Sequence, residues 1–186
     1  MTVDNFMSVA FEEARSALSE GEVPVGCVFV YKNTIIAKAG NQVNATKNAT
    51  RHAEFVCIDQ TLCYCCSHNL KPDEVFPQIT VVVTVEPCIM CLAALHNLKV
   101  KEIIYGCAND RFGGKSVVDV PQVLGQPLEM RAGLRAEEAM DLLKQFYKGQ
   151  NPSAPVAKRV FFFCYDFSNI FKNIVNVLQP TQKEIF

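Results

Sequence analysis

A short apolar run in the middle of the chain constrains the fold more than any other feature. Residues 79–85 have the sequence Ile-Thr-Val-Val-Val-Thr-Val, which is rich in the β-branched side chains that favour strands. Because the run does not alternate between apolar and charged residues, it predicts a central strand that is buried on both faces. A strand of this kind needs a covering layer on each side of its sheet.

The segments on either side of this strand supply those layers. The first expected helix has Asp4 as its N-cap and Gly21 as its stop. Lys32 and Asn33 separate two apolar runs, a gap typical of a hairpin. The order of elements predicts an α/β fold, a three-layer α/β/α sandwich with a mixed central sheet. The later helices are expected at residues 52–65, 88–98 and 135–148, and the strands at residues 25–31, 34–39, 79–85 and 103–106.

Length and charge limit what such a chain can do. Its 186 residues suit a single domain with a substantial core, which we place at residues 1–152. The formal net charge of −1 argues against a stand-alone nucleic-acid binder, since such proteins are usually strongly basic. A polyanionic substrate would therefore need a local basic patch or a basic partner chain.

Cysteine usage and the first residues indicate a compartment. The nine cysteines are an odd number, and residues 1–20 lack the basic start and apolar core of a signal peptide. We therefore expect reduced thiols and an intracellular protein, cytoplasmic or nuclear and not secreted. The chain has no long apolar stretch free of charge, so we expect no transmembrane helix and no membrane partner.

Two short motifs predict catalytic chemistry. His52, Cys88 and Cys91 are ligands that zinc prefers, and three protein ligands leave the fourth tetrahedral position open for water. The metal lowers the pKa of that water towards neutrality. Glu54 is a carboxylate that does not bind the metal, and it could carry protons between water and substrate.

The spacing of these motifs also predicts where they lie. Residues two apart in the middle of a helix point in nearly opposite directions, so His52 and Glu54 share a site only near a helix start. Thr50 is the expected N-cap there, and Pro87 suits the first turn of the helix that carries Cys88. We expect two helix N-termini to converge on one zinc ion. A pair of buried apolar cysteines is the alternative for Cys-x-x-Cys taken alone.

Longer stretches of the chain carry a family resemblance. From about residue 23 to residue 152 the chain resembles the tRNA-specific adenosine deaminases, and in particular their eukaryotic catalytic subunits. The YGC-x-N-x-RFGG stretch is the most typical of the eukaryotic group. The stretches that carry the resemblance are EVPVGCVFVY (22–31), NATRHAE (48–54), VTVEPCIMC (83–91), YGCANDRFGG (105–114) and RAEEAMDLLKQFY (135–147).

This resemblance implies a fold, a reaction and a partner. The fold would be that of the cytidine deaminases, with His52, Cys88 and Cys91 on zinc, Glu54 as proton shuttle and Asn41 in contact with the purine. The reaction would be hydrolytic deamination of adenosine to inosine at the wobble position of tRNA anticodons. The family's eukaryotic member forms a heterodimer with a homologous subunit that lacks the catalytic Glu. We therefore expect this chain to be inactive alone.

A basic and aromatic segment is a candidate RNA contact. Arg111, Phe112 and Lys115 combine charge for phosphate with a ring for stacking on an unpaired base. An ordinary turn beside the active site is the alternative.

Two further groups of residues have more modest interpretations. Cys63, Cys65, Cys66 and His68 could form a second zinc site, but their spacing fits a tetrahedral site poorly, so we interpret them as incidental. His96 follows Cys91 by five residues and should face away from the site, at the surface or an interface.

The end of the chain departs from the resemblance. The family usually ends in a short basic tail, whereas residues 153–186 are rich in phenylalanine. We expect this atypical tail to lie outside the core fold. Either it is an amphipathic helix that docks on a partner or membrane surface, or, as we prefer, it has no selected structure.

Two other functions are open at this stage. The same metal chemistry would serve a deaminase of a free base or nucleotide, although the NATRHAE and RFGG stretches favour tRNA. A non-catalytic scaffold subunit is also conceivable, but the presence of Glu54 argues against it.

Overall fold

The computed structural model describes residues 2–148. The expected tail at residues 153–186 and the domain boundary at residue 152 lie outside the described residues.

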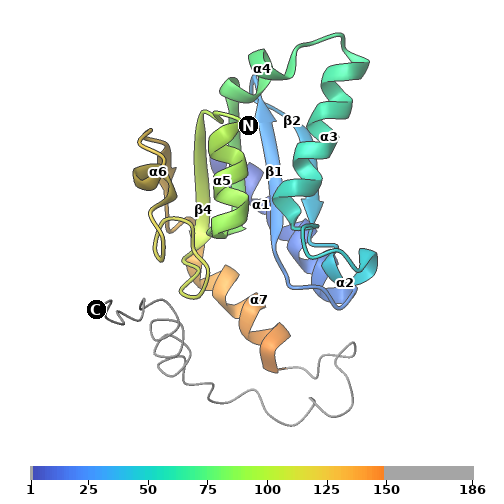
Figure 1. Ribbon diagram of the computed structural model, residues 1–186. Helices are drawn as coiled ribbons and strands as arrows, with labels where there is room; N and C mark the ends of the chain where they lie inside the picture. The colour runs from blue at the N-terminus through green and yellow to red at the C-terminus, as the bar shows by residue number, and fades with distance from the viewer. Residues whose placement is uncertain (1, 149–186) are drawn as a thin grey trace, which may run out of the picture. The chain divides into compact units, whose positions relative to one another are not determined.

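A mixed five-stranded sheet forms the centre of the part of the chain that the structure describes (Figure 1). Strand β1 pairs antiparallel with both β2 and β3, whereas β4 runs parallel to β3 and to β5. The strand order across the sheet is β2-β1-β3-β4-β5. The strands are β1 (Gly26–Tyr31), β2 (Thr34–Gly40), β3 (Ile79–Val85), β4 (Glu102–Cys107) and β5 (Glu129–Arg131).

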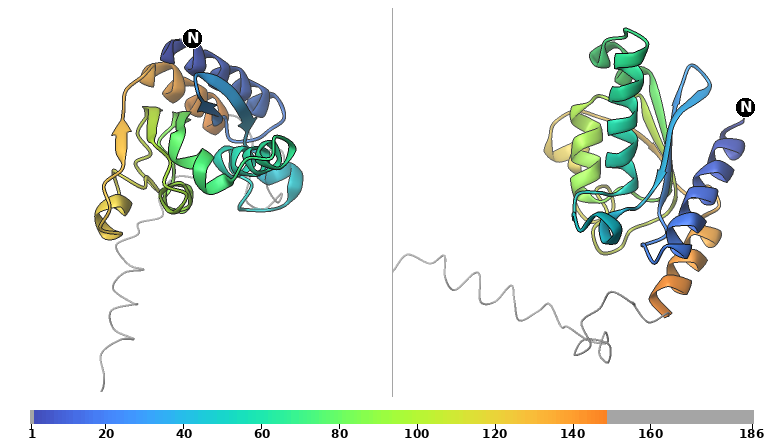
Figure 2. Two further views of the ribbon diagram at one scale, coloured as in Figure 1. Left: turned by 90° about the horizontal axis from the view of Figure 1, so that it is seen from above. Right: turned by 90° about the vertical axis from the view of Figure 1, so that its right-hand side faces the viewer.

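Helices cover both faces of this sheet, as Figure 2 shows. Helices α1 (Val3–Ser19) and α7 (Ala136–Lys148) pack on one face, and α3 (Ala53–Ser67) and α5 (Ile89–Asn97) pack on the other. Within β3, Val82 packs in the core on the face that α1 and α7 cover. Its neighbours Val81 and Val83 pack in the core on the face that α3 and α5 cover. The predicted three-layer α/β/α sandwich is therefore confirmed.

The first hairpin forms where the sequence predicts it. Lys32 and Asn33 both have positive φ, 47° and 63°, which is the backbone of a two-residue turn whose twist suits a hairpin. This turn places β2 beside β1, so β2 ends at Gly40 on the same edge of the sheet as the carboxyl end of β3, with β1 between the two strands. Asn41 thereby reaches the edge of the sheet at which the functional residues gather.

Close backbone approach fixes α1 on the sheet. A Cβ atom at Gly26 would lie 1.8 Å from the carbonyl oxygen of Ala10, so only glycine lets the helix and strand meet this closely. The N-cap of α1 is Thr2, and the prediction of Asp4 was wrong. The Thr2 side chain accepts a hydrogen bond from Asn5 N, whereas Asp4 lies in the first turn. Gly21 follows the helix with φ 76°, which confirms the predicted stop.

Short helices and one short strand lie in the segments where the sequence predicts loops. The strand β5 was not predicted, since only the middle residue of its three is apolar. Within residues 2–148 no helix has the length and apolar character that crossing a membrane requires. The short helices are α2 (Val43–Thr46), α4 (Pro72–Val75), η1 (Phe76–Gln78) and α6 (Val120–Val123).

Candidate active site

Two helix starts meet beside the carboxyl end of β3. His52 is the N-cap of α3 and Cys88 is the N-cap of α5, and both have extended backbone conformations. The predictions of Thr50 as the N-cap and of Pro87 inside the first turn were therefore wrong by one or two residues. Because an N-cap residue stands at the end of its helix, its side chain is free to point at the neighbouring helix. This arrangement brings His52 to Cys88 and Cys91.

The three predicted ligands form a compact group. Their donor atoms all lie within 4.8 Å of one another. His52 Nδ1 is 3.6 Å from Cys88 Sγ and 3.5 Å from Cys91 Sγ. Ordinary Zn–N and Zn–S bond lengths at a tetrahedral angle give an N···S separation of about 3.6 Å. The donor set and its spacing therefore fit one zinc ion.

Hydrogen bonds within this group bias its protonation. The pKa of Cys88 is lowered to about 4, because the Cys91 thiol and His52 donate hydrogen bonds to its sulfur. The pKa of Cys91 is raised, both because it is that donor and because it is buried. The pKa of His52 is raised by its bond to Cys88. The group thus already holds one thiolate, and zinc binding would release the remaining protons.

Glu54 lies beside this group with little access to solvent. It is the second residue of α3, and only 3% of it is exposed. Burial raises its pKa to about 7, although a hydrogen bond with its own backbone opposes the shift. A carboxyl group that titrates near neutrality is suited to accept and return a proton.

Asn41 connects the second strand to the same site. It is buried, and its Oδ1 accepts a hydrogen bond from the backbone N–H of Ala53 at 2.9 Å. This bond satisfies one of the free N–H groups at the start of α3. The side-chain amide nitrogen of Asn41 is then the group that could donate to a substrate.

Asn41, His52, Glu54 and Cys88 line one cavity of about 860 Å³. Ligand pockets for small molecules usually fall between about 300 and 1,000 Å³, so there is room for more than one base. One wall comes from α7, through Met140, Leu143, Lys144 and Tyr147, and this wall was not predicted from the sequence. The signal available in the sequence was a cation and an aromatic residue, Lys144 and Tyr147, three residues apart on the predicted helix. Glu86 was also missed, although it directly precedes Pro87.

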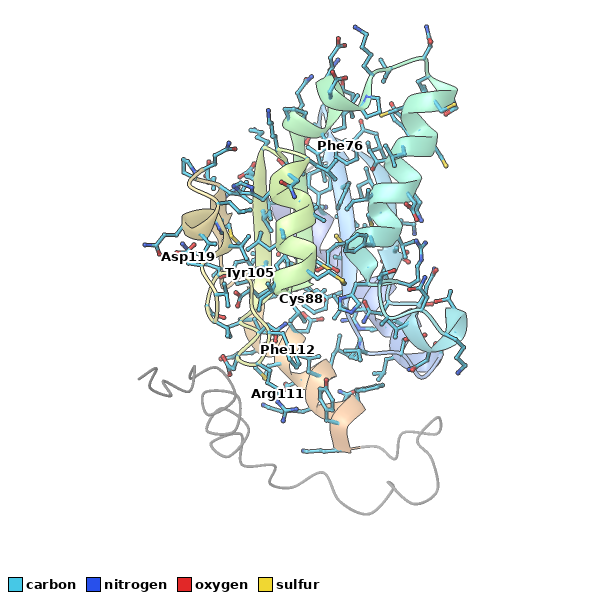
Figure 3. The ribbon with its side chains drawn as sticks, viewed as in Figure 1. Phe76, Cys88, Tyr105, Arg111, Phe112 and Asp119 are labelled. Atoms are coloured by element: carbon cyan, nitrogen blue, oxygen red, sulfur yellow. The ribbon has the colours of Figure 1, made fainter. Side chains whose placement is uncertain are left out.

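The predicted RNA-contact residues divide into two groups. Arg111 and Phe112 line the mouth of the cavity, and Phe112 is 63% exposed. Figure 3 shows both side chains on the loop below Cys88, close to α7. Lys115 does not line the cavity, and its Nζ forms an ion pair with Asp119.

The other metal-binding candidate does not form a site. Within residues 2–148, no second group of three possible ligands lies close together. The His68 ring stacks on Tyr64 with centroids 4.0 Å apart, while Cys63 and Cys66 are exposed.

His96 differs from the expectation of a residue at the surface or an interface. It is 7% exposed, and its Nε2 lies 3.0 Å from the carbonyl oxygen of Gln126. The helical spacing correctly predicts that His96 faces away from the zinc ligands. However, the segment after α6, which contains Gln126, covers that side of α5.

Comparison with known proteins gives consistent matches. A family model described as the cytidine and deoxycytidylate deaminase zinc-binding region matches residues 1–107. The chain is 49% identical over 162 residues to tRNA-specific adenosine deaminase 2 of Xenopus laevis, covering 84% of this chain and 92% of the relative. It is 41% identical over 156 residues to the tRNA-specific adenosine deaminase subunit tad2 of Schizosaccharomyces pombe, covering 82% of this chain and 39% of that protein.

A solved structure shows the same architecture. It comes from a study of A-to-I editing by tRNA:A34 deaminases at the wobble position of transfer RNA, and it superposes with a TM-score of 0.67. The two sequences are 30% identical, and the match covers 75% of this chain and 99% of the other.

Proposed function

This chain belongs to the cytidine and deoxycytidylate deaminase family, and from that premise we propose that it is a zinc-dependent tRNA adenosine deaminase. It converts adenosine to inosine at the wobble position of tRNA anticodons. One observation carries the proposal. His52, Cys88 and Cys91 lie together at two helix N-termini, and Glu54 lines the same cavity as His52 and Cys88.

The reaction exchanges the amino group at C6 of adenine for an oxygen atom from water. When bound by His52, Cys88 and Cys91, zinc would supply the Lewis acidity that activates water at neutral pH. Glu54 carries the two protons of that water, one to ring nitrogen N1 and one to the departing amino group. Ammonia leaves, and the product keeps a carbonyl at C6 and a proton on N1. The raised pKa of Glu54 matches this task, since the group must both take up and release protons.

Asn41 orients the purine in this scheme. Its oxygen is held by Ala53 N–H, so its amide N–H groups face the cavity as donors to the base. Because the same bond fixes the start of α3, the positions of the base and of Glu54 are linked.

Features at the mouth of the cavity favour RNA over a free base or nucleotide. The exposed rings of Phe112 and Tyr147 offer stacking surfaces for bases that flank the target. Arg111 supplies positive charge for the backbone phosphates, whereas Lys144, which also lines the cavity, is paired with Asp141. A free base needs none of these groups. A non-catalytic scaffold would have no use for a buried Glu54 beside three metal ligands.

A homologous, non-catalytic subunit completes the enzyme in this proposal. The net charge of −1 gives the chain no general attraction for tRNA, so the partner would supply basic surface. Four apolar side chains around α6 are exposed and would suit such an interface, namely Val117, Val118, Val123 and Leu124. The S. pombe relative is itself called a subunit.

The direct test measures inosine. A tRNA with adenosine at the wobble position is incubated with the chain co-purified with its homologous subunit, and inosine is quantified by sequencing and chromatography. We expect inosine in the tRNA and no ammonia from free adenosine, cytidine or guanine. Release of ammonia from a free base, with unmodified tRNA, would favour the free-base alternative.

The chain alone provides a second comparison. We expect much less inosine from the single chain than from the pair of subunits. Full activity of the single chain would exclude an obligatory partner.

The place of action is part of the proposal as well. The eight described cysteines are all free thiols, and two of them are needed as zinc ligands, which suits a reducing intracellular compartment. A fluorescent fusion would be expected in the cytoplasm or nucleus, and secretion into the medium would contradict this.

A further inference from the structure

Glu86 is a buried carboxylate that the deamination scheme does not use. It follows the last residue of β3 and lies two residues before Cys88. Only 1% of it is exposed, although its side chain borders the same cavity as Glu54. A buried carboxylate needs compensating hydrogen bonds.

The loop of residues 109–116 supplies all of those bonds. Glu86 Oε1 accepts from the backbone N–H groups of Lys115 at 2.9 Å and Ser116 at 2.8 Å. Glu86 Oε2 accepts from Asn109 N–H at 2.9 Å and from the Ser116 hydroxyl at 2.8 Å. A carboxylate offers about four acceptor positions, so the loop occupies the whole group.

The same loop is also tied to the start of α5. Gly113 forms an isolated bridge with Cys88. The backbone N–H of Ile89 donates to Phe112 O at 2.8 Å, and Gly114 N–H donates to Pro87 O at 2.9 Å. The loop therefore contacts residues on both sides of a metal ligand.

Two glycines permit this close fit. A Cβ atom at Gly113 would lie 2.5 Å from Glu86 Oε1, and one at Gly114 would lie 2.6 Å from Leu92 Cβ. Any other residue at either position would push the loop away from Glu86 or from α5. The backbone of the loop and the carboxylate thus fit together as one unit.

We propose that Glu86 is a positioning residue that fixes the 109–116 loop on the Cys88 end of α5 and thereby places Arg111 and Phe112 at the mouth of the cavity. This inference rests on the proposed function, because it assigns the loop to the recognition of RNA around the target base. In this role Glu86 neither contacts the substrate nor transfers a proton. It acts through the loop.

Amide hydrogen exchange of the full chain tests the positioning directly. In Glu86→Gln, an amide NH2 group replaces one carboxylate oxygen. This NH2 group cannot accept hydrogen bonds from the loop N–H groups that it faces. We expect the amide protons of Asn109, Lys115 and Ser116 to exchange about tenfold faster. Glu102→Gln is the matched control, because Glu102 is another buried carboxylate and bonds instead to Thr80 and Arg131.

A milder variant guards against loss of folding. Ser116→Ala removes one of the four donors and leaves the carboxylate in place. We expect faster exchange in the same loop, by a smaller factor than in Glu86→Gln. The proposal would be overturned if the 109–116 loop exchanged at the wild-type rate in Glu86→Gln, in Ser116→Ala and in the Glu102→Gln control.

Kinetics of the enzyme with its partner subunit test the link to RNA. We expect Glu86→Gln to raise KM for tRNA about tenfold, with zinc content unchanged and a smaller change in kcat. Arg111→Ala should cost about tenfold in kcat/KM in the wild type but less than about threefold in the Glu86→Gln background, since the two residues act through one loop. Additive effects would overturn the proposal.

The two arms separate this inference from the proposed function. If wild-type enzyme makes no inosine while the Glu86→Gln loop still exchanges faster, the proposed function fails and the anchoring of the loop stands. If inosine forms normally but amide exchange in the loop is unchanged in Glu86→Gln, only the positioning role fails.

Discussion

Glu54 and Glu86 line the same cavity, but their surroundings shift their pKa values in opposite directions. Burial raises the pKa of Glu54 to about 7. Burial alone would also raise the pKa of Glu86, yet hydrogen bonds from Asn109, Ser116 and Lys115 outweigh it and lower the pKa. Opposite shifts in neighbouring carboxylates are a sign of divided roles. One group exchanges protons and the other stays ionised to hold a loop.

The proton-carrying role of Glu54 predicts the effect of an isosteric change. Glu54→Gln should lower kcat by about a thousandfold, because general acid–base catalysis contributes on the order of 10² to 10⁴. The zinc content and melting temperature should stay close to wild type, since Glu54 is not one of the grouped ligands. Rate measurement on tRNA and metal analysis test this together. A variant that keeps more than a tenth of the activity would contradict the role.

The three-ligand group predicts a metal content of about one zinc ion per chain. Cys91→Ser should lose the metal and the activity, because the buried Cys91 is one of the three protein donors grouped within residues 2–148. Cys66→Ser is the matched control, since Cys66 is exposed on α3 and should change neither. Activity lost on chelation should return when zinc is added. Two zinc ions per chain would instead indicate a second site.

Glu102 predicts how stability depends on pH. Burial opposes its ionisation, but bonds from Thr80 Oγ1 at 2.9 Å and Arg131 Nη2 at 2.6 Å lower its pKa. Because the folded pKa lies below the unfolded one, ionised Glu102 stabilises the protein above the unfolded pKa. This stability is lost as the pH falls through the folded pKa.

The matching measurement is urea unfolding of wild type and Glu102→Gln. The difference in free energy of unfolding should be about 1–3 kcal/mol at pH 7 and should shrink below about pH 4. A difference that is equal at both pH values would assign the effect of the substitution to packing instead.

The sequence predicted those parts of the site that depend on local spacing. His52 and Glu54 had to lie at a helix start to share a site, and α3 does begin beside them. The β-branched run at residues 79–85 predicted a strand covered on both faces, and β3 is buried in this way. Such features follow from a few consecutive residues and the geometry of one element.

Other features depend on contacts between distant residues, and the sequence did not predict them. Glu86 carries no local sign that it will accept bonds from residues 109–116. The position of His96 on its helix predicts exposure to solvent, but in the structure the distant segment containing Gln126 covers it. The N-cap of α3 also depends on tertiary structure, because Asn41 rather than Thr50 satisfies the N–H of Ala53.

Two glycines with different surroundings predict different costs of substitution. A Cβ atom at Gly26 would collide with the backbone oxygen of Ala10, so Gly26→Ala must separate α1 from β1. We expect a loss of about 3 kcal/mol or more in the free energy of unfolding. Gly125 has φ 69° and open space around it, so Gly125→Ala should cost only about 1 kcal/mol, from backbone strain. Denaturant unfolding of both variants measures the difference, and equal losses would contradict the close-contact argument.

The surroundings of the cations predict which of them binds RNA. Arg111 lines the cavity, whereas the Nζ of Lys115 is paired with Asp119 and lies outside the lining. Arg111→Ala should weaken tRNA binding about tenfold and reduce the slope of log affinity against log salt by about 0.7. Lys115→Ala should have a smaller effect, because its charge is already partly neutralised.

Phe112 and a distant lysine complete this comparison. Phe112→Ala should weaken binding by about 1–3 kcal/mol through lost stacking, with little change in the salt slope. Lys71→Ala is the matched control, since Lys71 pairs with Glu74 on the surface and does not line the cavity. Binding is measured by titration of labelled tRNA at several salt concentrations. If Arg111→Ala binds tRNA as well as Lys71→Ala does, the mouth of the cavity is not where the RNA backbone lies.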